Sequence, residues 1–175
     1  AYDGAIAAFS PRLSLILPTG DYKKGLGAGS VGIQVNLPLS IRLGRYFVTH
    51  LNAGGTFTPR SRYKNFWGNT RHYNPLDFSF AGSVIWLAHK NINLMLEGLC
   101  ISKETPGEYG GILREYSYYV NPGFRCAINH ESGLQVVPGL SFPVGFGSAQ
   151  GEWGVYLYLS FEHIMWKAPE PVTKQ

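Results

Sequence analysis

The sequence predicts an all-β protein: an up-and-down antiparallel transmembrane β-barrel with eight strands in this chain. Apolar and polar residues alternate over long stretches, which is the period of a strand and not of a helix. Only 15% of the 175 residues are charged while 14% are aromatic, and no run reaches the roughly 18 apolar residues of a membrane-spanning helix. Short and long connectors also alternate along the chain, as in outer-membrane barrels. We expect one barrel domain over 1–166 and a polar tail over 167–175.

The clearest strand covers residues 31–43. Every odd position from Val31 to Leu43 is large and apolar, whereas the even positions are Gly, Gln, Asn, Pro, Ser and Arg. A helix would scatter these apolar residues all round its surface, so the pattern indicates a strand with one apolar face. Seven further segments repeat the alternation: 9–17, 47–57, 78–88, 92–100, 118–128, 134–146 and 155–161.

The connectors between these segments fall into two classes. Three are short, at 44–45, 89–91 and 130–133, and four are long, at 18–30, 58–77, 102–117 and 147–152. An even number of strands places both chain ends on the short-turn side of a barrel. Prolines inside the segments indicate bulges or strand ends, because proline cannot donate to the ladder; they are Pro11, Pro38, Pro122, Pro138 and Pro143.

The composition of the two faces predicts which one meets lipid. The polar face carries Ser, Asn, Gln, Gly and Tyr with few charges, unlike a solvated surface rich in Lys and Glu. The apolar face carries bulky residues on nearly every strand, which would overfill the interior of a small barrel. We therefore expect the apolar face outside, against outer-membrane lipid and lipopolysaccharide, and not the reverse arrangement of a soluble lipid carrier. Interfacial aromatic girdles would be formed by Tyr46, Phe47, Trp86, Tyr116, Tyr118, Trp153 and Trp166.

The polar face then lines the lumen. Its charges of both signs suggest a paired network, which either sets selectivity for a solute or simply fills the interior of a narrow barrel. His50 lies beside Asn52 on this face, but no Ser or Asp partner for catalysis is identifiable, so we expect a hydrogen-bonded histidine and no enzyme. The predicted lumen residues are Arg12, Gln34, Asn36, Arg42, His50, Asn52, Glu97, Asn121, Arg125 and Glu162.

The long loop at 60–77 is the second candidate site. It interleaves cations and aromatic rings, a mixture that suits lipopolysaccharide phosphates, an aromatic solute or a protein partner; the alternative is an ordinary solvated loop. Its candidate residues are Arg60, Arg62, Tyr63, Lys64, Trp67, Arg71 and Tyr73. The glycine-rich segment 19–30 lacks a following helix, so we expect a flexible loop there and not a phosphate cradle.

The remaining composition predicts few partners. The net charge of +4 is scattered, which argues against nucleic-acid binding. Cys100 and Cys126 lack the spacing of a metal site, so we expect no metal and no cofactor. By phase both lie on the apolar face, and whether they pair stays open.

Four segments resemble one bacterial family: SPRLSLILPTGD at 10–21, VNLPLS at 35–40, FVTHLNAG at 47–54 and YLYLSFEH at 156–163. They are similar to outer-membrane transporters associated with the meta-pathway of phenol degradation. The resemblance implies a bacterial outer-membrane location, ten to twelve strands in a full-length protein, and a transporter or porin-like channel for small solutes, with aromatic compounds among the candidates. The alternative is a non-conducting barrel that anchors or docks a partner in an outer-membrane or cell-surface assembly.

Overall fold

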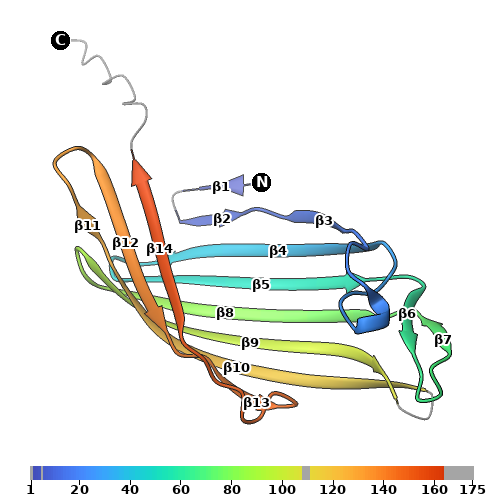
Figure 1. Ribbon diagram of the computed structural model, residues 1–175. Coiled ribbons are helices and arrows are strands. Elements are labelled where there is room, and N and C mark those ends of the chain that lie inside the picture. The colour runs from blue at the N-terminus through green and yellow to red at the C-terminus, as the bar shows by residue number, and fades with distance from the viewer. Residues whose placement is uncertain (1, 5, 108–110, 164–175) are drawn as a thin grey trace.

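The computed structural model describes residues 2–4, 6–107 and 111–163, and these form one large antiparallel sheet and a small hairpin (Figure 1). No α-helix occurs among them, and none of their helical segments is long and apolar enough to cross a membrane. The expected tail at 167–175 and Trp166 lie outside the described residues. The all-β, antiparallel part of the prediction is confirmed.

The strands follow the predicted order. They are β1 (Tyr2–Asp3), β2 (Ala7–Phe9), β3 (Arg12–Ile16), β4 (Gly32–Leu43), β5 (Phe47–Phe57), β6 (Ser61–Lys64), β7 (Thr70–Tyr73), β8 (Leu76–His89), β9 (Ile92–Pro106), β10 (Ile112–Cys126), β11 (Ile128–Asn129), β12 (Leu134–Ser141), β13 (Val144–Gly147) and β14 (Tyr156–His163). A short 3₁₀ turn, η1 (Tyr22–Lys24), lies between β3 and β4. Each of the eight predicted strands is present, and the spatial order follows the chain from β2–β3 through β4, β5, β8, β9, β10 and β12 to β14.

Prolines explain why two of the predicted strands are split. The pairing of β2 and β3 with β4 keeps one register across Ser10 and Pro11, which lie opposite Pro38 and Leu37. The same holds for β12 and β13 against β10, where the break falls opposite Pro122. Because proline has no N–H to give, ladder bonds are lost at these points while the strands stay aligned.

One predicted loop is wrong. Residues 102–117 were expected to form a long connector, but β9 runs on to Pro106 and β10 begins at Ile112, with fifteen paired positions between the two strands. Apolar alternation stops there because an ion pair between Glu104 and Arg114 replaces it. These two side chains share a face with Phe78, whose ring centroid lies 5.7 Å from the Arg114 guanidinium carbon.

The pairing register gathers the apolar side chains on one face. Leu37, Ala53, Phe80, Cys100, Tyr118 and Phe146 form one continuous row across six strands. This apolar face is not covered: among the described residues the only buried hydrophobic side chains are Ile85, Val137 and Ala149. Leu157 and Leu13, for example, are large apolar side chains on this face that are 85% and 70% exposed. The described residues therefore form no apolar core of the kind that a soluble domain of this length builds.

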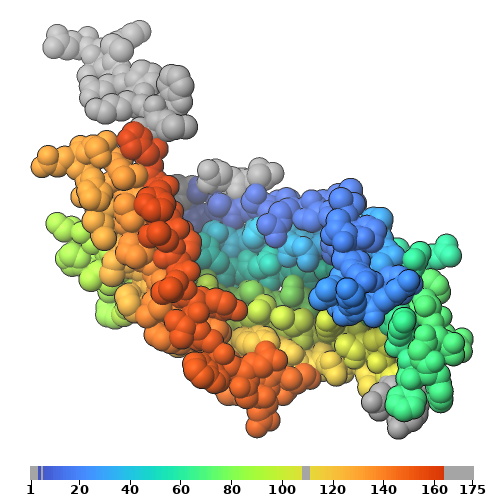
Figure 2. Space-filling view, viewed as in Figure 1, coloured from blue at the N-terminus to red at the C-terminus, as the bar shows by residue number. Residues whose placement is uncertain are grey.

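The opposite, polar face is the concave one. A Cβ added to Gly54, on the polar face of β5, would meet the side-chain oxygens of Asn36 and Ser79 at 2.6 Å. A Cβ added to Gly98, on the apolar face, would meet nothing closer than 4.0 Å. Side chains converge on the inside of a curved sheet and spread on its outside, and Figure 2 shows the hollow side of this curved surface.

The sheet is open, whereas the sequence predicted a closed barrel. Among the described residues no backbone pairing joins β14 to the β1–β3 edge. In Figure 1 the long strands β4 to β10 lie side by side, and the β12–β14 pair runs steeply across one end of them. The structure thus has two free edges, β14 and β1–β3.

Candidate functional site

The ten predicted lumen residues all lie on the concave polar face. The register places Ser40, His50, Ser83, Glu97 and Asn121 in one row that crosses five neighbouring strands. The remaining predicted residues sit in parallel rows; Arg12 faces Asn36, for example, and Gln135 faces Glu162. The period-two pattern alone therefore predicted a shared face for side chains far apart in the sequence.

The hydrogen bonds on this face come from neutral donors, and the expected arginine–glutamate pairs are not among them. Asn121 Nδ2 donates to Glu97 Oε2 at 2.7 Å, and Asn52 Nδ2 donates to Asn36 Oδ1 at 3.3 Å. Within the part of the chain that the structure describes, the single ion pair is Arg114–Glu104, on the other face. Among the described residues the charges of the polar face thus have no partner of opposite charge.

His50 has a partner that sequence analysis missed. Its Nδ1 lies 2.7 Å from the Ser40 hydroxyl oxygen. The two residues face each other because the turn at 44–46 fixes the register between β4 and β5, and that register was the signal that could have revealed the pair. Nucleophilic catalysis also needs a third group that orients the histidine. Among the described residues no hydrogen bond reaches the Nε2 of His50, so the contact supports positioning of the ring and not a catalytic triad.

Glu97 stands at the centre of the polar face. A hollow of about 420 Å³ lies beside it, over Ser40, His50 and Ser83. A second hollow of about 360 Å³ lies between Glu97, Tyr119 and Glu152. Side chains therefore do not fill the concave side near this carboxylate, and solvent or a small solute has access to it.

The second candidate site lies at the long-loop end of the strands. The predicted loop at 58–77 folds into the β6–β7 hairpin, whose tip is closed by Asn65: its side chain accepts from Asn69 N at 2.9 Å. Arg62 N donates to Ala28 O at 2.8 Å, which docks the hairpin against the glycine-rich segment.

The glycine-rich segment is also ordered by specific contacts. Asp21 caps η1 by accepting from Lys23 N at 2.9 Å. A Cβ on Gly20 would lie 1.5 Å from Leu26 O, so only glycine permits this approach. The Arg62 guanidinium carbon lies 5.6 Å from the centroid of the Tyr22 ring, in a cation–π contact that joins the hairpin to the segment. These contacts hold the glycine-rich segment in a defined conformation beside the hairpin, whereas the sequence predicted a flexible loop there.

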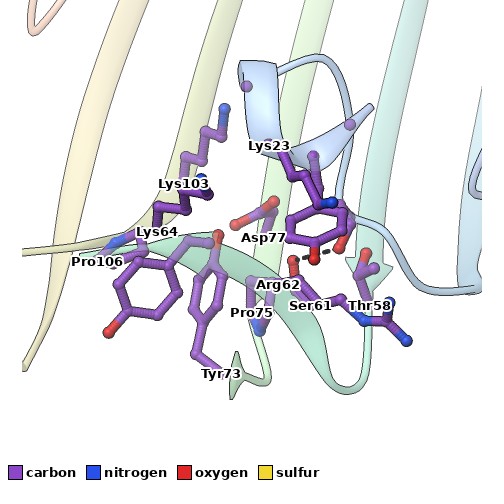
Figure 3. A pocket seen from close by; sticks show the side chains of 15 residues that line it. Lys23, Thr58, Ser61, Arg62, Lys64, Tyr73, Pro75, Asp77, Lys103 and Pro106 are labelled. Carbon is purple, nitrogen blue, oxygen red and sulfur yellow. Dashed lines mark hydrogen bonds between the residues drawn. The ribbon is translucent and has the colours of Figure 1, made fainter. Parts of the chain in front are cut away.

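Between these elements lies a cavity of about 570 Å³, which we call the loop-end pocket (Figure 3). Four predicted loop residues line it, namely Arg62, Tyr63, Lys64 and Tyr73, whereas Arg60, Trp67 and Arg71 do not. Sequence analysis missed its contributions from other elements: Tyr22, Lys23, Asp77 and Lys103. Burial raises the pKa of the Tyr73 phenol above its ordinary value.

Other kinds of site find no support in the described part of the chain. No group of three or more His, Cys, Asp or Glu residues there is arranged to hold a metal ion. Cys100 and Cys126 are free thiols, and the register places them opposite Tyr118 and Ile92, far apart along the same pair of strands. The two cysteines therefore do not pair with each other.

Comparison with known proteins gives no match to this chain, whether against protein-family models, curated proteins or solved structures.

Proposed function

We propose that this chain forms the wall of a bacterial outer-membrane β-barrel that acts as a transporter or porin-like channel for small solutes. The observation that carries the proposal is the apolar face, which the register aligns from β3 across the sheet to β14 and whose large side chains are exposed. Soluble monomers rarely expose a contiguous apolar patch larger than a few hundred Å². A lipid bilayer is the environment in which such a face is stable.

The placement of the aromatic residues agrees with a bilayer. Phe47 and Trp86 stack with centroids 6.5 Å apart beside the short turns. Tyr116 is exposed on the apolar face toward the long-loop end, whereas Tyr118 is exposed near the middle of β10. The amphipathic rings of Trp86 and Tyr116, at the two ends of the apolar band, match the interfacial girdles of membrane barrels.

The open edges bear on how the barrel closes. In a bilayer the unpaired backbone groups of β14 and of β1–β3 would be unsatisfied, at a cost of several kcal/mol each. Both edges carry the same alternation, with Leu13 and Leu15 exposed on β3 and Leu157 and Leu159 exposed on β14. We infer that the two edges are joined, either directly or through further strands of a ten- to twelve-stranded barrel.

The polar face would then line the solute path. It offers hydrogen-bonding groups and unpaired charges around the hollows beside Glu97. Rings of such side chains set the selectivity of membrane pores. The resemblance to outer-membrane transporters associated with phenol degradation is consistent with this function, and small aromatic compounds are accordingly among the solutes to test.

Conductance across planar lipid bilayers tests the proposal. Refolded protein should insert and give stepwise conductance, and Glu97→Lys should shift the preference between K⁺ and Cl⁻ toward Cl⁻. Glu131→Lys, in the short turn at 130–133, is the matched control because it makes the same charge change away from the polar face. Insertion without conductance would leave a non-conducting barrel that anchors or docks a partner, and failure to insert would remove the membrane proposal.

A further inference from the structure

The loop-end pocket carries an excess of positive charge. Lys23, Arg62, Lys64 and Lys103 line it, and Asp77 is the single carboxylate among its lining residues. In the described part of the chain none of these four cations lies within ion-pair distance of an acidic group. The Asp77 carboxylate is itself engaged, because its Oδ1 accepts from Glu104 N at 2.8 Å.

The cations are held by three separate elements. Lys23 belongs to η1, Arg62 and Lys64 to β6, and Lys103 to β9. Figure 3 shows Lys64 and Lys103 on one side of Asp77 and Lys23 on the other. The hydrogen bond from Arg62 N to Ala28 O fixes the hairpin against the glycine-rich segment. The positive charges thus surround a preformed space, which lowers the cost of binding an anion.

The rest of the lining combines aromatic and apolar side chains with the hydroxyl groups of Thr58 and Ser61. Tyr22, Tyr63 and Tyr73 contribute rings, and Pro75 and Pro106 contribute apolar surface. A flat organic body can pack against such walls while its anionic group meets the cations. A bare inorganic ion would contact the cations but leave these walls unused.

The pocket opens on the polar side of the sheet. Phe78 and Ser102 pair on the apolar face, so the adjacent Asp77 and Lys103 point to the opposite, polar face. Lipid headgroups would surround the apolar face, whereas a solute would enter along the polar one. This placement favours a dissolved ligand over a lipopolysaccharide phosphate.

We propose that the loop-end pocket binds small organic anions that carry a carboxylate or phosphate group on a compact, flat body, and so captures them at the mouth of the barrel. The position at a mouth depends on the proposed function, but binding itself does not. The pocket belongs to the described structure whether or not the protein conducts.

Calorimetric titration of the refolded protein in a zwitterionic detergent tests the proposal, with benzoate as the probe and benzamide as its neutral counterpart. Benzoate should bind saturably and benzamide should not. The double variant Lys23→Gln/Lys103→Gln should weaken benzoate binding by about tenfold or more, because two of four nearby charges are removed. The control Lys24→Gln/Lys90→Gln removes the same charge outside the pocket and should change binding by less than about twofold.

Several results would overturn the proposal: no saturable benzoate binding, equal binding of benzamide, or equal weakening by the control variant. A further arm uses vesicles containing lipopolysaccharide; saturation of the site by these vesicles without any benzoate binding would assign the cations to lipid. Since the titration requires no conduction, a conducting protein that binds no benzoate contradicts only this inference. A protein that binds benzoate but does not conduct contradicts only the channel function.

Discussion

The carboxylate of Glu97 accepts a 2.7 Å hydrogen bond from the side-chain amide of Asn121 across the β9–β10 ladder. The side-chain oxygen of Asn121, Oδ1, is buried and has no hydrogen-bond partner. The Glu97 carboxylate is therefore held by a neutral donor, and Asn121 Oδ1 is an acceptor that receives no hydrogen bond. This relationship decides how the two residues should respond to substitution.

Glu97→Gln should change the free energy of unfolding by no more than about 1 kcal/mol. Glutamine can keep the bond from Asn121 Nδ2 and can donate its own amide to the unpartnered Oδ1. Asn121→Leu should destabilise the protein more, by about 1–3 kcal/mol, because it leaves the half-buried carboxylate without this donor. Urea unfolding in detergent compares the two. A larger loss for Glu97→Gln would mean that the charge itself is paired, as the sequence had suggested.

Two glycines on neighbouring strands test the curvature of the sheet. Gly54→Ala should destabilise the protein by about 1–3 kcal/mol, because its Cβ would press on Asn36 and Ser79 on the concave face. Gly82→Ala on the apolar face should be neutral or slightly stabilising, since its Cβ would meet only Leu51 Cδ2 at 3.5 Å. Thermal unfolding of both variants provides the comparison. Equal losses would show that the polar face is not the crowded one.

The long-loop end should face the outside of the cell. An epitope tag inserted after Gly68, at the exposed tip of the β6–β7 hairpin, should be recognised by antibody on intact cells. The same tag after Arg45, in the turn between β4 and β5, should be recognised only after lysis. Labelling of intact cells at Arg45 but not at Gly68 would reverse the topology.

The strands and their faces could be predicted because a sheet with one apolar and one polar face leaves a period of two in the sequence. The segment at 47–57 coincides with β5 for this reason. The pattern fails where other forces hold the strands. The β6–β7 hairpin has no apolar face and depends on Asn65 and on the bond from Arg60 N to Asn74 Oδ1.

The candidate site was only partly predictable. The shared polar face followed from strand phase, but the contact between Ser40 and His50 depends on a register set by a three-residue turn. The loop-end pocket unites η1, β6 and β9, which are far apart in the sequence, so no local pattern reveals Lys23 and Lys103 as neighbours of Lys64. Whether the barrel closes could not be predicted from local sequence patterns either, because closure depends on which strands pair with the two free edges.

The most direct test of the central proposal is a pair of substitutions on β14, Leu159→Arg and Tyr158→Arg. The two residues are adjacent, and their exposures of 59% and 51% are similar, so neither change removes much more packing than the other. Leu159 lies on the apolar face and Tyr158 on the polar face. An arginine at mid-bilayer on the lipid face costs about 2–4 kcal/mol.

The measurement is the free energy of folding into lipid bilayers, obtained by urea titration. We expect Leu159→Arg to lower this free energy by about 2–4 kcal/mol and Tyr158→Arg to change it by less than about 1 kcal/mol. Equal losses, or a greater loss for Tyr158→Arg, would contradict the assignment of the apolar face to lipid.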